Sequence, residues 1–311
     1  MKKLAIILPI VFVVLACAGA FSYYQFVQIP KEIKKQVKEV SLAYDEYNQI
    51  IEKELETKLN DLEESKKKME NAGNINALKE TTEEKTGSSS GFGTLPSTSI
   101  ETEGNLSKLK TTLAKLKDRS GELDTAIKKL NLSQTAQYKT YLMNYKKDTE
   151  SVIKEMKAGI ELYEQFVKIM KSFEELNLKS LYNSSEEASA KDLLAKIKEV
   201  SKKIKSIQDQ SKSLKFQDIG SLKEQVSLFS DSMSLVLQTV DIMIGAIENL
   251  DQKKAIEGRE SFAKTIKDLT DKANRLTIKE LERVENQKEV IKKSQKRITN
   301  EYESLRVQYN F

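Results

Sequence analysis

The chain has 311 residues and is close to electrically neutral for its size, with 52 basic and 47 acidic side chains. This balance does not support a nucleic-acid groove, which needs a clustered excess of Lys and Arg on one face. The chain has no histidine and one cysteine, so ordinary Cys/His zinc sites and the usual general base near neutral pH are excluded.

Residues 4–29 carry no charge and follow directly after Lys2 and Lys3. At about 1.5 Å per helical residue, this run is long enough to cross about 30 Å of hydrocarbon. The first interpretation is an uncleaved signal-anchor, in which residues 4–24 span the bilayer and Lys2 and Lys3 stay on its cytoplasmic side. The lysines at 31, 34, 35 and 38 weaken the charge bias that would orient this span.

Two alternatives for this segment depend on small residues around Cys17. Val14-Leu15-Ala16-Cys17 resembles the lipobox of bacterial lipoproteins, which makes Cys17 a candidate lipidation site, although Leu15 departs from the motif's preference for a smaller residue. The runs 16–18 and 18–20 fit a signal-peptidase site, which would release the protein. All three interpretations treat residues 1–30 as a membrane anchor or signal segment. They leave the bulk of the chain outside the cytoplasm, and we expect it to be membrane-anchored.

Beyond this segment, the apolar positions predict long helices. Residues 31–71 form a juxtamembrane coiled-coil-like helix, because its apolar residues recur at alternating steps of three and four. Its seam comprises Ile33, Val37, Val40, Tyr44, Tyr47 and Ile51. Residues 72–104 contain a Gly/Ser-rich run and Pro96, with little periodicity, and are predicted to be a flexible linker.

Residues 105–250 predict two helical hairpins. Leu109, Leu113 and Leu116 map onto Leu193, Ile197 and Val200 at an offset of 84, and this offset continues along both hairpins. A duplication explains the match, as do two unrelated hairpins of similar length. Capping-box spacing at 184–187 and 221–224 predicts the helix starts of the second hairpin.

Two further helices are predicted from apolar residues in the second half of the chain. Residues 231–250 are the most apolar stretch after the N-terminal segment and are predicted to be the buried central helix. Residues 251–311 predict one long helix, with a seam ending at Leu276 and another starting at Leu281 after a phase slip.

No pattern in the chain indicates catalysis, a cofactor or a metal. The carboxylates at Glu186, Glu187, Glu280 and Glu282 are interpreted as solvated helix faces, because a catalytic pair would need a cleft that desolvates one of them. The glycines at 87, 91 and 93 lack the flanking strand, helix start and lysine of a phosphate loop. A tyrosine stripe is interpreted as core and half-buried interface positions: Tyr138, Tyr141, Tyr145 and Tyr163.

These observations predict an all-α protein, an elongated antiparallel helical bundle with coiled-coil-like helices behind an N-terminal membrane segment. We expect a non-enzymatic binding or scaffold module of the cell envelope. It would contact the membrane through its N-terminal segment and an unidentified protein or envelope partner, with no nucleic acid. The heptad-like helices also allow a homo-oligomer. The alternative is a sensory or regulatory input module that works through a partner membrane protein.

Overall fold

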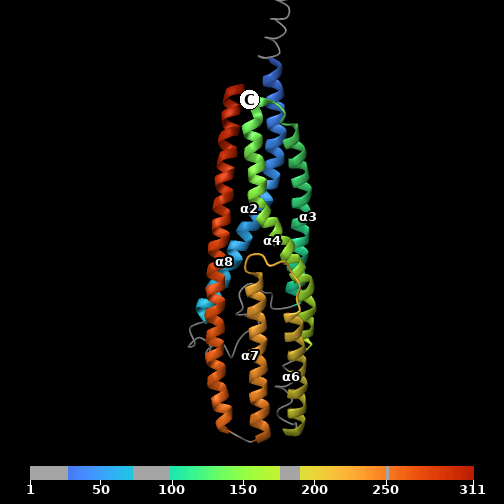
Figure 1. The fold of residues 1–311 in the computed structure, drawn as a ribbon, viewed down its shortest axis with the longest axis vertical. Coiled ribbons are helices and arrows are strands. Elements are labelled where there is room, and N and C mark those ends of the chain that lie inside the picture. The colour runs from blue at the N-terminus through green and yellow to red at the C-terminus, as the bar shows by residue number, and fades with distance from the viewer. Residues whose placement is uncertain (1–26, 73–98, 176–189, 250–251) are drawn as a thin grey trace, which may run out of the picture. The chain divides into compact units, whose positions relative to one another are not determined.

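The computed structural model describes residues 27–72, 99–175, 190–249 and 252–311, and within these ranges it is all-helical with no strand, which confirms the predicted all-α class (Figure 1). In chain order the α-helices are α2 (Ile29–Ala72), α3 (Ser99–Lys129), α4 (Ala136–Glu174), α6 (Ala190–Lys212), α7 (Leu222–Asn249) and α8 (Gln252–Tyr309). A short 3₁₀ helix, η3 (Ser133–Thr135), lies between α3 and α4.

The chain divides into two compact units, and four helices contribute residues to both of them. Unit 1 combines the described residues up to Glu52 with Lys115–Glu150 and Lys288–Phe311. Unit 2 combines Lys53–Ala114 with Ser151–Gln287.

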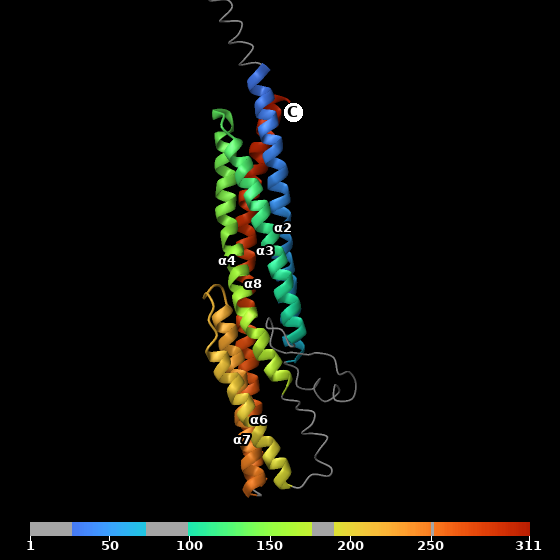
Figure 2. The ribbon, with the colours of Figure 1, turned by 90° about the vertical axis from the view of Figure 1, so that its right-hand side faces the viewer.

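In unit 1, segments of α2, α3, α4 and α8 lie side by side (Figure 2). The six predicted seam residues of α2, from Ile33 to Ile51, are all at most 7% exposed. Alternating steps of three and four keep these side chains on one face of the helix, so the seam faces the other three helices. The sequence pattern therefore located the core of unit 1 correctly along α2.

Tyrosines supply much of this interior, together with a few polar partners. The rings of Tyr44 and Tyr145 meet edge to face, with centroids 5.1 Å apart. The Tyr47 hydroxyl and Thr149 Oγ1, both fully buried, lie 2.8 Å apart. Tyr145 donates a hydrogen bond to Asn48 Oδ1. Because a buried hydroxyl without a partner is costly, these bonds tie α2 to α4 at specific positions.

At the end of α8, Asn310 adopts a left-handed conformation with φ of 53°, which ends the helix after Tyr309. The backbone N–H of Phe311 then bonds back to Arg306 O at 3.2 Å, the pattern of a Schellman cap. The Phe311 ring returns to Tyr302, at 6.2 Å between centroids. The cap thus folds an aromatic ring back onto unit 1.

In unit 2, α6 and α7 form a hairpin whose apolar faces pack against α4 (Figure 1). Phe166 of α4 is fully buried and meets Phe229 of α7 edge to face at 4.9 Å. The loop after α6 is fastened to α4, because Lys215 N–H donates to Gln165 Oε1 at 2.9 Å and Gln165 donates back to Lys215 O. The core of this hairpin comprises Phe166, Ile169, Met170, Val200, Ile204, Ile207 and Met233.

The start of α7 follows from its local sequence. Gly220 has φ of +64°, a conformation that glycine adopts without the Cβ clash of other residues. Ser221 precedes the helix at the predicted cap position, and Gln225 Nε2 donates to its Oγ at 2.8 Å. A Cβ at Gly220 would lie 3.2 Å from the Arg283 guanidinium of α8. Glycine is therefore favoured here by the backbone conformation, and any side chain would also press on Arg283.

Several predicted boundaries need correction. Helix α3 begins at Ser99, so residues 99–104 are helical, and the predicted 72–104 linker is too long at this end. The rest of the predicted linker, the capping-box start at 184–187 and the membrane segment lie outside the described residues.

The prediction of a buried central helix at 231–250 is wrong for the described residues. Among these, only Ser232, Met233 and Leu235 are buried, whereas Val236, Val240 and Ile244 are half-buried. A strongly apolar composition therefore does not mean full burial here. Helix α8 spans Gln252–Tyr309, within the helix predicted for 251–311, and the hairpin domains and the duplication stay predictions.

We expect opposite effects from alanine at two glycines. A Cβ at Gly121, in the middle of α3, would meet nothing within 4 Å, so Gly121→Ala should raise the unfolding free energy by about 0.5–1 kcal/mol. Gly220→Ala should lower it by about 1 kcal/mol or more, because of its left-handed backbone. Urea unfolding followed by circular dichroism measures both. Equal shifts for the two variants would contradict the described backbone.

Candidate functional site

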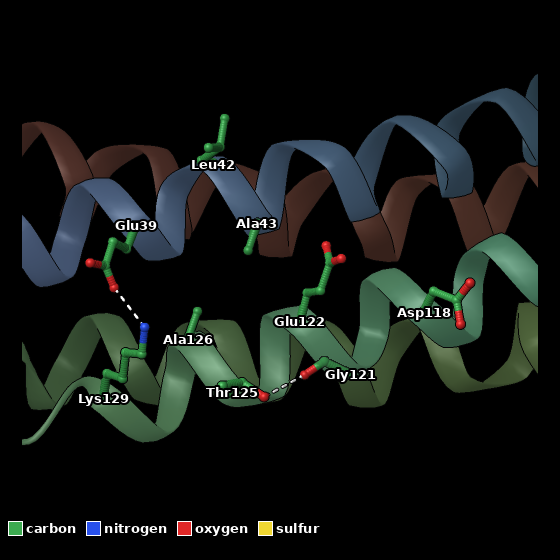
Figure 3. Close-up of a pocket in the computed structure, with 9 residues that line it drawn as sticks. All are labelled: Glu39, Leu42, Ala43, Asp118, Gly121, Glu122, Thr125, Ala126 and Lys129. Carbon is green, nitrogen blue, oxygen red and sulfur yellow. Dashed lines mark hydrogen bonds and ion pairs between the residues drawn. The ribbon is translucent and has the colours of Figure 1, made fainter.

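An open groove on the surface of unit 1 runs between α2 and α3 (Figure 3). Three of the side chains that line it come from α2 and six positions come from α3. They are Glu39, Leu42, Ala43, Asp118, Gly121, Glu122, Thr125, Ala126 and Lys129. The groove therefore combines charged, small and exposed apolar groups in one place.

Ion pairs cross the groove towards each of its ends. Lys129 Nζ lies 2.9 Å from a carboxylate oxygen of Glu39. On the other side, Arg119 Nη1 lies 2.8 Å from Glu46 of α2 and also pairs with Glu122 of its own helix. The order of the paired residues is reversed between the two helices, because Glu39 precedes Glu46 in α2 whereas Lys129 follows Arg119 in α3. Exposed pairs add little stability, so their main effect is to place charge around the groove.

Small side chains between these pairs create the hollow. Ala43 and Ala126 reach into the space between the helices in Figure 3, and Gly121 contributes no side chain. The Thr125 hydroxyl donates to Gly121 O at 2.9 Å, so it is turned onto its own helix. Leu42 points outwards at the rim and is 63% exposed, in a helix whose seam residues are buried. Leu42 and the two alanines are the apolar groups that this surface offers beside its charges.

The groove carries an excess of negative charge. The residues that line it include three carboxylates, Glu39, Asp118 and Glu122, and one cation, Lys129. The hydrogen bond from Lys129 and the attraction of its charge lower the pKa of Glu39, so this carboxylate stays ionised at neutral pH. The groove therefore favours a partner that presents positive charge together with an apolar side chain.

A second polar cluster lies inside unit 2 and joins α2, α4 and α8. Lys58 Nζ lies 2.8 Å from Glu155 and 3.0 Å from Glu280. Arg283 donates to Glu280 Oε2 and to Glu155 Oε2, each at 2.9 Å. The Glu155 and Glu280 side chains are 12% and 5% exposed, whereas the two cations retain about a third of their exposure. Two carboxylates thus share two cations.

This cluster corrects the interpretation of Glu280 as part of a solvated face. Burial alone would raise its pKa, but hydrogen bonds and charge from Arg283 and Lys58 outweigh burial and lower the pKa to about 2. The pKa of Glu155 is lowered for the same reasons. A carboxylate held ionised by two cations is unsuited to general acid or base catalysis near pH 7, so we interpret the cluster as structural.

A continuous seam on α8 accounts for this burial. Ala273, Thr277, Glu280 and Val284 are buried at steps of four, three and four. The predicted phase slip between Leu276 and Leu281 is therefore wrong. The seam continues through this stretch, but polar residues occupy it where the prediction assumed apolar ones. The sequence signal for this cluster was the alternation of steps of three and four along α8. Extending it through positions 277 and 280 would have predicted that Glu280 is buried.

The other sequence candidates are placed as follows. Cys17, Glu186 and Glu187 lie outside the described residues. Tyr138 and Tyr145 are fully buried, and Tyr141 and Tyr163 are half-buried, in agreement with the interpretation of the tyrosine stripe. Within the described ranges, no group of three or more Cys, His, Asp or Glu residues could hold a metal ion. The same ranges contain no helix apolar enough over sufficient length to cross a membrane.

Comparisons with protein-family models, with curated proteins and with solved structures give no match.

The ion cluster predicts a specific loss of stability in acid. The pKa of Glu280 is lowered from 4.5 to about 2. Its contribution to the free energy of unfolding is therefore fully present above pH 4.5 and is lost as the pH falls towards 2. That contribution is on the order of 3 kcal/mol. Glu280→Gln should remove most of it at pH 7 and flatten the acid dependence of the unfolding free energy.

The neighbouring Glu282 provides the control, because it is exposed on the same helix. Glu282→Gln should change the unfolding free energy by about 0.5 kcal/mol or less at any of these pH values. Urea titrations across this pH range measure both variants. The same acid dependence in the wild type and in Glu280→Gln would show that the cluster is not formed.

Proposed function

We propose that this protein is a non-enzymatic binding or scaffold module of the cell envelope and that it binds a partner protein through the α2–α3 groove. The observation that carries the proposal is the combination at one place of an exposed Leu42, a hollow lined by small residues and an excess of carboxylates. A helix with one apolar anchor and flanking Lys or Arg matches this surface, with the anchor in the hollow and the cations on the rim.

We also propose that the helices associate as an antiparallel, coiled-coil-like bundle behind an N-terminal membrane anchor. Support comes from contacts between α3 and α4, where Asp124 pairs with Lys146 in unit 1 and Lys110 pairs with Glu164 in unit 2. From the first of these pairs to the second, the residue number falls along α3 and rises along α4, as expected for helices that run in opposite directions. Support for the anchor comes from the uncharged run at residues 4–29.

A groove-filling variant tests the binding proposal. Gly121→Phe places a large ring in the groove, where a Cβ has open space, and should reduce partner capture about tenfold or more. The full-length chain, tagged and cross-linked in native membranes, is purified, and the captured proteins are quantified by mass spectrometry. The partner should be a protein whose captured segment is a basic helix, or a second copy of this chain.

Gly104→Phe is the matched control, because Gly104 lies on the same helix, belongs to unit 2 and also has open space for a Cβ. It should capture the partner as well as the wild type does. If all three proteins capture the same set in equal amounts, the groove is not the binding site. Loss of capture by both variants would assign the effect to α3 in general and contradict the proposal equally.

Attachment is tested at Cys17. With an uncleaved anchor, Cys17→Ala should leave both the apparent mass and the membrane association unchanged, because the apolar span inserts without a lipid. Immunoblots of membrane fractions and fatty-acid incorporation measure the two properties. A larger unprocessed product that has lost incorporated fatty acid would replace the anchor with a lipoprotein.

A further inference from the structure

Three segments far apart in the sequence meet at one end of unit 1 (Figure 2). They are the first turns of α2, the α3–α4 connection and the last turns of α8. Gln36 of α2 donates to Asn131 in the connection at 3.0 Å. Tyr138, just after the connection, contacts Tyr302 of α8 at 6.5 Å between ring centroids. We call this surface the α2-start end, formed by residues 29–39, 128–139 and 301–311.

The α2-start end is rich in positive charge. Its three segments contain eight basic and four acidic side chains. Three of the basic groups have partners there, since Lys129 pairs with Glu39, Arg306 pairs with Glu303 and Lys139 donates to Leu130 O. The remaining five are exposed and form no ion pair with any described residue: Lys31, Lys34, Lys35, Lys38 and Lys128.

Four of these five lysines form one stripe. Their spacing of three, four and seven residues places Lys31, Lys34, Lys35 and Lys38 on a single face of α2, opposite the buried seam. Such a row of cations repels itself, and within it the charge of Lys35 interacts favourably with Glu39. These lysines also oppose the charge bias expected for the predicted span. Both costs would be offset by an anionic surface that faces the stripe.

Apolar groups accompany this charge. Val307 is 78% exposed on the last turn of α8, and the Phe311 ring is half-buried beside Tyr302. An exposed valine and an aromatic ring among lysines are typical of surfaces that rest on a lipid headgroup region.

We infer that the α2-start end binds anionic phospholipid headgroups, so that unit 1 rests on the bilayer from which α2 emerges. The inference depends on the proposed membrane anchor, which would deliver Ile29 to the membrane surface. Lys31, Lys34 and Lys35 lie within about 10 Å of Ile29 along the helix, which is within reach of an anionic surface at physiological ionic strength. The lysine stripe attracts the headgroup phosphates, and Val307 enters the interfacial layer.

The absence of tryptophan from the chain allows a direct test. Val307→Trp and Val290→Trp each introduce one fluorophore at an exposed position of α8 in unit 1, and the two sites are about 26 Å apart along the helix. Each full-length variant is reconstituted into liposomes with brominated acyl chains, made either of phosphatidylcholine alone or with phosphatidylglycerol added.

We expect the fluorophore of the Val307→Trp protein to be strongly quenched and blue-shifted only in liposomes with phosphatidylglycerol, with loss of both effects at high salt. The fluorophore of the Val290→Trp protein should not be quenched. Reversal of Lys31, Lys34 and Lys35 to Glu in the Val307→Trp protein should abolish the quenching. Reversal of Lys292, Lys293 and Lys296, exposed on α8 away from this end, should leave it unchanged.

Two readouts separate this inference from the anchor on which it depends. Flotation with phosphatidylcholine liposomes measures the anchor alone, and failure to float would overturn the anchor. If the Val307→Trp protein floats but is quenched equally in both lipids, or in neither, the headgroup inference is wrong. Equal loss of quenching in the two triple variants would also overturn it, because charge at any position would then suffice.

Discussion

The shared ion cluster of Lys58, Glu155, Glu280 and Arg283 fixes how α2, α4 and α8 are aligned within unit 2. Its carboxylates are almost fully removed from water, and each contacts both cations. Removing one partner from such a cluster leaves an uncompensated buried charge, which costs about 3–5 kcal/mol. An apolar seam alone tolerates sliding of one helix along another by a repeat, whereas these charges have partners in one alignment only.

In unit 1, hydrogen bonds between side chains align α2 with α4 and α8. Tyr47 meets Thr149, and Gln295 of α8 donates to Asn48 of α2 at 2.6 Å. Because these bonds hold α2 by its inner face, its outer residues are presented at defined positions. Glu39 and Ala43 therefore face the groove beside α3, Leu42 lies at its rim, and the lysine stripe runs from the start of the helix. The proposed partner site and the proposed lipid contact both depend on α2 being held in this way.

The sequence predicted the helices well because apolar residues at steps of three and four reveal a seam directly, as from Ile33 to Ile51 in α2. It failed where the seam is polar. Thr277 and Glu280 are buried in α8, but their chemistry resembles that of a solvated face, so the pattern suggested a phase slip. The groove was not predictable either, since Ala43, Gly121 and Ala126 form a hollow only when α2 and α3 are placed together. Conversely, the apolar α7 predicted more burial than its described residues have, because burial depends on neighbouring helices as well as composition.

Hydrogen exchange of the full-length chain, resolved by peptide, tests most directly whether α2 is packed as described. The account predicts that amides along the buried seam of α2, from Ile33 to Ile51, exchange as slowly as those of α4 around Tyr145 and Thr149, because both open only when unit 1 unfolds. Exchange of the α2 seam at the rate of an isolated helix, with α4 still protected, would contradict the account. In that case neither the groove nor the lysine-rich end would exist as a fixed surface.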